Sequence, residues 1–271
     1  MRILFYFVCF TLLGCVDSSK TAVSQKKGHN PNLTTNTKMN KLGLIGGTSW
    51  HSTIEYYRYI NEAVNKHYGN NTNPPLMVYT VNQAEVHKLQ TENQWSGIAD
   101  LFVEAGQHLE AAGAEQLMFC ANTPHKIYRQ VQEQLTVPIL HIADATATSI
   151  KQQHIDKVCF LGTKYSMSET FITQRIADQG IEVLVPEDAQ VIEELHRIII
   201  EELTYDNIDI DSKKYVIDVI QSLMDKGAKG VILGCTEFPL MITAADLEIP
   251  IFNTTEIHAL AGVDYILSNQ K

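Results

Sequence analysis

The stretch VILGCTEFP, residues 231–239, places a cysteine directly after an apolar run that is typical of a buried strand. Gly234 begins a tight turn, so Cys235 would lie at the carboxyl end of the strand, where open α/β sheets bind their ligands. Backbone N–H groups of the turn and the start of the next helix favour the thiolate over the thiol. The stretch therefore predicts a catalytic thiol, and the alternative is a buried, inert cysteine beside a helix start.

A second copy of this stretch lies earlier in the chain. Residues 108–125 align without gaps with residues 222–239, and the alignment places Ala121 opposite Cys235. Residues 41–47 match residues 157–163 at nearly the same offset. Two strand–turn–helix units that recur in this way indicate two similar α/β halves. We expect their crevices to face each other across a pseudo-twofold axis, with one turn from each half on either side of a bound ligand.

Strands alternate with helices along the chain, so the sheets should be mainly parallel and flanked by helices. We expect a first lobe at residues 41–142, joined by residues 250–271, and a second lobe at residues 143–249. A polar stretch with Gln90 should precede a helix at about residues 98–112. The predicted strands are residues 42–45, 76–81, 117–119, 138–142, 157–161, 181–185, 231–233 and 249–252.

The first 15 residues have the pattern of a bacterial lipoprotein signal peptide. Arg2 supplies a positive charge, residues 3–13 are apolar but too few to span a bilayer, and Leu-Leu-Gly-Cys ends at Cys15. Cleavage before Cys15 and lipidation of its thiol would anchor the protein to a membrane, on the periplasmic side or at the cell surface. Residues 16–40, rich in Ser, Thr, Asn and Lys, would form a flexible tether.

A start of translation at Met39 is the alternative, and it would give a cytoplasmic protein. Cys120, Cys159 and Cys235 remain after the signal peptide and the lipidated cysteine are set aside, and this odd number predicts no disulfide framework. Free thiols fit an oxidising compartment poorly, which favours the Met39 start. The net charge of −10 and the lack of a basic patch in the sequence argue against nucleic acid as a partner.

Five motifs stand out along the chain: GLIGGTSWHSTIEYYRYIN at 43–61, CANTPH at 120–125, HIADAT at 141–146, LGTKYSM at 161–167 and GCTE at 234–237. Together they resemble the aspartate/glutamate racemase family, over nearly the whole chain from residue 41 onward. The resemblance implies cofactor-independent racemisation of an amino acid, without pyridoxal or metal, and a possible homodimer. In that family two cysteines on opposite faces of the α-carbon remove and return the proton.

The chain departs from the family at the first catalytic cysteine. Cys235 matches the second family cysteine, but Ala121 stands where the first would precede Asn-Thr. Cys120 is one residue earlier, and on a strand it should point to the other face of the sheet. Because some relatives carry Thr there, the loss need not end activity, but it places two-base racemisation in question.

The remaining site residues follow from the resemblance, although each could instead cap a helix or shape a turn. Glu237 is interpreted as a carboxylate favoured by the positive end of a helix dipole, and His141 as an interior histidine. Lys164, Arg58 and Arg197 are the candidates for binding a side-chain carboxylate. The resemblance assigns Asn122, Thr123, Thr163 and Thr236 to the α-carboxylate and amino group, with Thr48, Ser49 and Gln90 lining the pocket.

Three functions are compatible with the sequence. The first is an amino-acid racemase for aspartate or glutamate, with aspartate favoured. The second is a one-cysteine decarboxylase or isomerase of small dicarboxylates, which needs a proton donor on one face only. The third is a lipid-anchored solute-binding protein without turnover. Cys235 separates them, because a binding protein needs no thiol at that turn.

Overall fold

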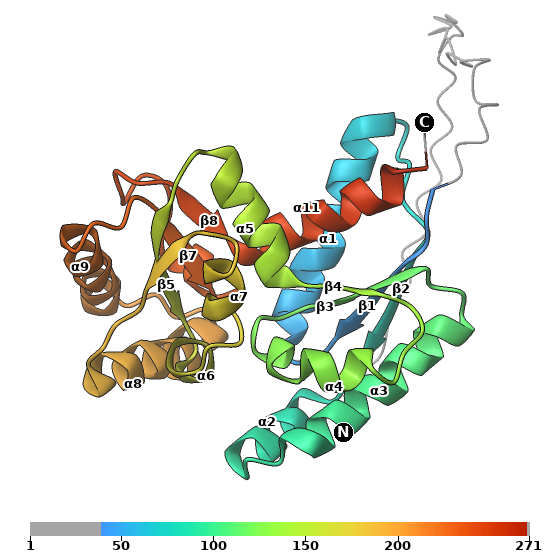
Figure 1. The fold of residues 1–271 in the computed structure, drawn as a ribbon, viewed down its shortest axis with the longest axis horizontal. Helices are drawn as coiled ribbons and strands as arrows, with labels where there is room; N and C mark the ends of the chain where they lie inside the picture. Colours follow the sequence, from blue (N-terminus) through green and yellow to red (C-terminus); the bar gives the residue numbers. More distant parts are fainter. Residues whose placement is uncertain (1–38, 270–271) are drawn as a thin grey trace, which may run out of the picture. The chain divides into compact units, whose positions relative to one another are not determined.

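The computed structural model describes residues 39–269, all within one compact unit of residues 37–271 (Figure 1). The predicted signal peptide, Cys15 and the predicted tether up to residue 38 lie outside the described residues. None of the helices between residues 39 and 269 is both long and apolar enough to cross a bilayer.

The first sheet has four parallel strands in the order β2-β1-β3-β4. The central strand β1 is buried at all five positions, as expected of a strand covered on both faces. The elements of this first half of the chain are β1 (Leu42–Gly46), α1 (Trp50–Tyr68), β2 (Leu76–Thr80), α2 (Gln83–Thr91), α3 (Trp95–Ala111), β3 (Gln116–Phe119), the 3-10 helix η1 (Thr123–Ile127), α4 (Tyr128–Gln132) and β4 (Ile139–Leu140).

The second sheet repeats this arrangement, with four parallel strands in the order β6-β5-β7-β8. The fold is therefore α/β with two parallel sheets of the same strand order, as the internal repeat predicts. Its elements are α5 (Ile142–Gln152), β5 (Lys157–Gly162), α6 (Lys164–Ser168), α7 (Thr173–Ala177), β6 (Glu182–Leu184), α8 (Ala189–Arg197), the π-helix η2 (Ile198–Glu202), the 3-10 helix η3 (Leu203–Tyr205), α9 (Ile210–Asp225), β7 (Val231–Gly234), α10 (Phe238–Met241), β8 (Ile251–Asn253) and α11 (Thr254–Leu267).

Two differences from the predicted elements affect the site or the lobes. Helix α2 occupies what we expected to be a polar stretch, and Asn82 begins it by accepting a hydrogen bond from Ala84 N. Residues 250–271, predicted to join the first lobe, are divided: β8 pairs with β7 in the second sheet, while α11 packs on α1. The chain thus crosses between the lobes twice, at β4–α5 and at β8–α11.

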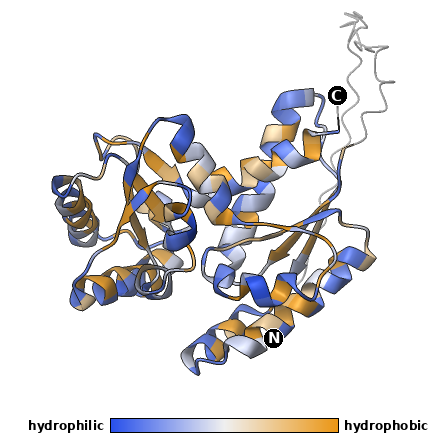
Figure 2. Cartoon of the chain, viewed as in Figure 1, coloured by the Kyte–Doolittle hydropathy of each residue, from blue (hydrophilic) through white to orange (hydrophobic). Residues whose placement is uncertain are grey.

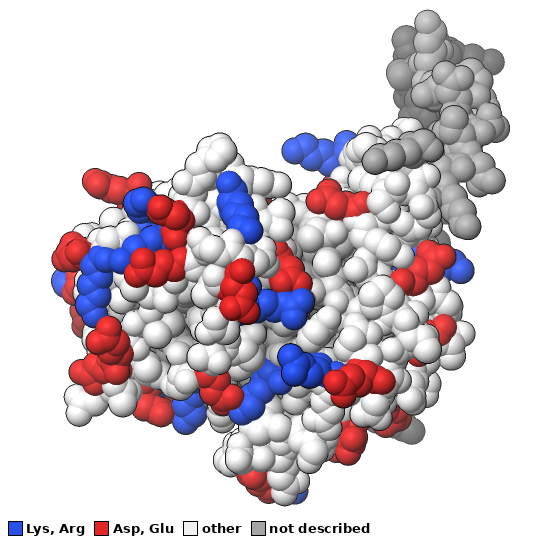
Figure 3. All heavy atoms as spheres, in the orientation of Figure 1, with Lys and Arg blue, Asp and Glu red and all other residues white. Residues whose placement is uncertain are grey.

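Each sheet is covered by apolar side chains, and Figure 2 shows hydrophobic residues along the strands and mixed colouring on the surrounding helices. Close contacts fix the turns that follow the strands. Gly47 has φ +92°, and a Cβ atom there would lie 2.1 Å from Val81 O, so only glycine fits. On the face shown in Figure 3, acidic and basic side chains are interspersed.

Candidate functional site

A cavity of about 540 Å³ lies where the turns of the two lobes meet. The turns after β1 and β3 contribute from the first sheet, and those after β5 and β7 contribute from the second. Because β1 pairs with β3 and β5 with β7, each lobe presents two neighbouring carboxyl ends of parallel strands. The cavity lining includes every residue that we assigned to the site: Thr48, Ser49, Gln90, Asn122, Thr123, Thr163, Cys235 and Thr236.

Cys235 is buried at the end of β7, and its thiol is hydrogen-bonded. The side chain is 8% exposed, and Sγ donates to Glu237 Oε2 at 2.8 Å. Burial raises the pKa of the thiol well above its usual range, and the neighbouring Glu237 carboxylate raises it further. The expectation that the turn favours the thiolate of Cys235 was therefore wrong. Backbone N–H groups of the turn do act to lower the pKa, but burial and the carboxylate outweigh them.

Glu237 is a site residue that the sequence analysis missed. It lies at the N-terminus of α10, where we expected a carboxylate, and its side chain makes no capping hydrogen bond. Its carboxylate instead accepts hydrogen bonds from Cys235 Sγ, from Thr236 Oγ1 at 2.8 Å and, across the lobes, from Ser49 Oγ at 3.3 Å. A carboxylate two residues beyond a candidate catalytic thiol was the available signal.

The turn after β3 faces Cys235 from the other lobe and presents a methyl group and polar side chains. Ala121 and the mostly buried Asn122 and Thr123 line the cavity. Asn122 Nδ2 donates to Thr254 Oγ1 at 2.9 Å, which leaves its buried Oδ1 without a partner among the described residues. Thr123 Oγ1 lies 3.2 Å from Thr163 Oγ1, so hydroxyls of the two lobes meet in the site.

The model of the Asp/Glu/hydantoin racemase family matches residues 45–262. The chain belongs to this family. The crystal structure of a proposed Asp/Glu racemase from Yersinia pestis is 43% identical, covers 84% of this chain and 100% of that chain, and has a TM-score of 0.80. An aspartate racemase homologue from Pyrococcus horikoshii is 37% identical, with coverage of 85% and 100% and a TM-score of 0.74.

A curated relative with a named activity is the broad specificity amino-acid racemase RacX of Bacillus subtilis. It is 21% identical over 233 residues, which are 84% of this chain and 99% of the relative. The expected resemblance to the aspartate/glutamate racemases is thus confirmed, and so is the two-lobed α/β fold.

In this member of the racemase family only one thiol lines the cavity among residues 39–269. Cys120 does not line the cavity but packs with Leu42 and Leu44 in the core on one face of the first sheet. Burial raises the pKa of its thiol far above the usual range. Cys159 lies in the core of the second lobe, and burial raises its pKa to about 12. Ala121 therefore leaves the first-lobe side of the cavity without a thiol.

Of the three cations considered for a side-chain carboxylate, only Lys164 lines the cavity. Its Nζ forms an ion pair with Glu193 Oε2 at 3.5 Å. Arg58 pairs with Glu55 and Glu62 along α1, and Arg197 pairs with Glu194 and Glu202. Lys164 is thus the one of these three cations that faces the cavity.

Helix α2 supplies part of the wall that sequence reasoning did not foresee. Gln83, His87 and Gln90 line the cavity at the spacing of one helical face. Ser49 and Thr163 were expected either to line the pocket or to cap a helix, and each does both. Each lines the cavity, and their hydroxyls accept hydrogen bonds from Ser52 N and Ser166 N respectively. No group of three His, Cys, Asp or Glu side chains in residues 39–269 is arranged to hold a metal ion.

His125 fixes the turn that carries Ala121 and Asn122. Its Nδ1 donates to Ala121 O at 3.0 Å and Asn122 O at 3.2 Å, while Nε2 accepts from Ile142 N at 3.2 Å. These partners define the neutral Nδ1–H tautomer. Burial lowers the pKa of His125 to about 4, so a neutral imidazole joins the site turn to the first crossing between the lobes.

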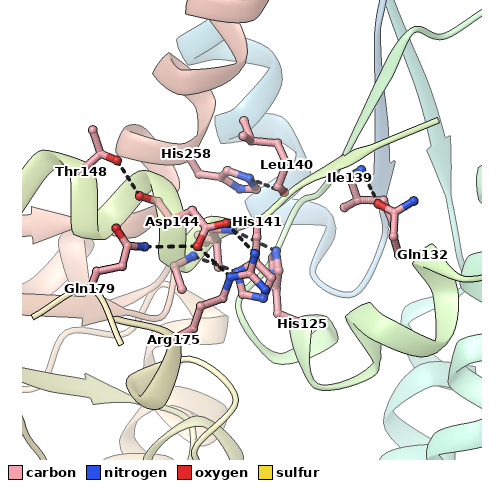
Figure 4. A network of polar contacts seen from close by, with 12 residues as sticks. His125, Gln132, Ile139, Leu140, His141, Asp144, Thr148, Arg175, Gln179 and His258 are labelled. Carbon is pink, nitrogen blue, oxygen red and sulfur yellow. Dashed lines mark hydrogen bonds and ion pairs between the residues drawn. The ribbon is translucent and has the colours of Figure 1, made fainter. Parts of the chain in front are cut away.

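Two further buried histidines stand beside His125 (Figure 4). His141, predicted to be interior, is 3% exposed and begins α5 by accepting from Ala143 N at 3.1 Å. His258 on α11 donates to Leu140 O at 3.0 Å and accepts from Tyr56 Oη at 2.7 Å. Burial lowers the pKa of both imidazoles, so this cluster at the crossings is uncharged at neutral pH.

Proposed function

We propose that the protein is an amino-acid racemase that acts on aspartate or glutamate and exchanges the α-proton through Cys235. The carrying observation is a buried thiol, hydrogen-bonded to a carboxylate, in the cavity built by the strand-end turns of a racemase-family fold. The similar proteins from Yersinia pestis and Pyrococcus horikoshii, described as a proposed Asp/Glu racemase and an aspartate racemase homologue, favour an acidic substrate. RacX of Bacillus subtilis, which is less similar to this chain, is named a broad specificity amino-acid racemase.

The polar groups of the site would hold the two charged groups on the α-carbon. Removal of an α-proton creates a carbanion, which hydroxyl and amide donors stabilise when they are fixed around the α-carboxylate. Thr123 and Thr163 supply such hydroxyls from the two lobes, and Thr236 and Thr48 lie on the same lining. The free Oδ1 of Asn122 is suited to accept a hydrogen bond from the α-ammonium group.

Glu237 supplies what the neutral thiol lacks as a base. Transfer of the thiol proton to Glu237 Oε2, along the 2.8 Å hydrogen bond, produces the thiolate. The thiolate then takes the α-proton, and the electrons of the Cα–H bond remain on the substrate. Return of a proton from Cys235 to the same face regenerates the starting enantiomer, and protonation of the opposite face gives the mirror image.

Protonation of the opposite face must use another source, because the methyl group of Ala121 carries no exchangeable proton. Water or a neighbouring side chain would deliver that proton, so inversion should be slower than exchange. The same asymmetry favours a second candidate, a one-cysteine decarboxylase or isomerase of small dicarboxylates. A non-catalytic solute-binding protein, the third candidate, would leave the Cys235–Glu237 pair without a purpose.

Lys164 supports an acidic substrate. It is the one Lys or Arg on the lining of the large cavity among the described residues, and a side-chain carboxylate of the substrate would pair with its ammonium group. This interaction selects aspartate and glutamate over neutral amino acids.

The membrane anchor and the homodimer remain predictions. Metabolic labelling with a fatty-acid probe should mark the wild-type protein and spare a Cys15→Ser variant. An unlabelled product that starts at Met39 would contradict the anchor. The mass of the purified protein in solution would test the homodimer.

Exchange in heavy water tests the proposed function. Wild-type protein should incorporate deuterium at Cα of aspartate or glutamate, and Cys235→Ser should not. A panel that includes neutral and aromatic amino acids and small dicarboxylates serves as the specificity control. Exchange confined to neutral or aromatic substrates would contradict the acidic assignment, and carbon dioxide release without exchange would favour the decarboxylase.

A further inference from the structure

A second, smaller cavity of about 150 Å³ lies on the other side of the Cys235 turn. Thr236 and Glu237 line both cavities, so the Glu237 side chain stands between them. The smaller cavity is also lined by His51 and Glu55 of α1 and by Asp206, which follows η3. Its volume is sufficient for water molecules, and although its walls are mainly apolar, the side chains of His51, Asp206 and Glu237 can offer them hydrogen-bond partners.

We propose that Glu237 and this second cavity form a proton route that connects Cys235 with solvent. The inference rests on the proposed function, because it assigns the path by which the racemase thiol would gain and lose its proton. His51 and Asp206 are the groups that carry the proton beyond Glu237.

The two oxygens of Glu237 are bonded differently. Oε2 accepts from Cys235 Sγ and from Thr236 Oγ1, each at 2.8 Å, whereas Oε1 accepts only the longer bond from Ser49 Oγ at 3.3 Å. A carboxylate can take a proton from the thiol and release it towards a second partner. Because Glu237 is 7% exposed, such a partner must come from one of the two cavities.

Proton balance in a one-thiol racemase requires such a route. Each inversion leaves the substrate's original α-proton on the Cys235–Glu237 pair, because the replacement proton reaches the opposite face from elsewhere. The pair must lose that proton before the next turnover. A substrate in the large cavity blocks direct contact of the thiol with water there, whereas the second cavity remains on the far side of Glu237.

The residues beyond Glu237 are suited to proton transfer. Asp206 is exposed, so it connects the second cavity with bulk solvent. His51 lines the same cavity, and its buried Nδ1 has no hydrogen-bond partner among the described residues. Glu55 is already engaged by Arg58 at 2.5 Å, which leaves His51 and Asp206 as the available groups.

The test compares washout of substrate deuterium by the wild-type protein and by variants of the second cavity. Cα-deuterated aspartate or glutamate that keeps its configuration loses its label over repeated turnovers in ordinary water only if the abstracted deuterons leave the Cys235–Glu237 pair for solvent. Asp206→Asn, which tolerates the left-handed backbone at φ 55°, and His51→Gln should each slow washout. We expect about a tenfold loss in the double variant, equivalent to about 1.4 kcal/mol of barrier, with KM unchanged.

Chemical rescue separates a proton route from a structural role. Added imidazole should restore washout in the Asp206→Asn and His51→Gln variants in proportion to its concentration, and it should leave Cys235→Ser inactive. Asp100→Asn, an exposed aspartate on α3 that lines neither cavity, is the matched control and should behave as wild type.

Wild-type washout rates in the double variant, or a loss that imidazole does not restore, would overturn the route while leaving the racemase intact. A wild-type protein that exchanges the α-hydrogen of no amino acid would overturn the proposed function and the route together.

Discussion

Acidification should destabilise the protein through the buried histidines at the crossings between the lobes. Burial holds the pKa of His125 at about 4 in the folded state, against 6.5 for an unperturbed histidine. Between these values the unfolded chain binds a proton that the folded protein excludes, so stability is complete above the unfolded pKa and falls as the pH is lowered towards the folded pKa. His125 alone should cost about 2 kcal/mol at about pH 5 and about 3 kcal/mol near about pH 4.

The assay is urea unfolding at a series of pH values, with His125→Asn as the partner variant. The asparagine amide can still donate a hydrogen bond towards the carbonyls of Ala121 and Asn122, but it does not titrate. His141 and His258 are present in both proteins, so their contributions largely cancel in the difference. The free energy of unfolding should fall more steeply with acid in wild type, by close to one proton in this pH range. Parallel curves for the two proteins would refute this account of His125.

Three substitutions test the site more directly. Ala121→Cys should raise the slower direction of racemisation, because it places a thiol on the first-lobe turn; an unchanged ratio of initial rates in the two directions would count against the one-thiol account. Lys164→Met should raise KM for aspartate and glutamate by about tenfold or more, the loss expected for one hydrogen bond between charged groups, while KM for any neutral substrate stays constant. Cys120→Ser should lower the free energy of unfolding by about 1–3 kcal/mol as a buried hydroxyl replaces a thiol, yet leave α-proton exchange unchanged. Loss of exchange in that variant would identify Cys120 as a second base.

Much of the site follows from local sequence because parallel strands place their carboxyl-terminal turns together. The repeat that set Ala121 opposite Cys235 predicted two lobes and two facing turns, and one cavity does receive both residues. The strand register likewise directed Cys120 away from the site and into the core. Periodicity and turn chemistry are enough for such conclusions, since they depend on residues close in sequence.

Other features depend on contacts between distant residues. The protonated state of Cys235 is set by burial and by the orientation of Glu237, neither of which the sequence specifies. Helix α2 carries Gln90 to the cavity, but its short polar sequence resembles a loop. The split of residues 250–271 between the lobes reflects the packing of α11 on α1, a contact between segments far apart in the chain.

The central claim is that Cys235 exchanges the α-proton on one face of an acidic amino acid. Initial rates of deuterium incorporation from heavy water into L- and D-aspartate, and into the two glutamate enantiomers, test it most directly. The account predicts unequal rates for the two enantiomers in wild-type protein, and no incorporation for either enantiomer in Cys235→Ser. Equal rates in wild-type protein, or incorporation that survives in Cys235→Ser, would contradict it.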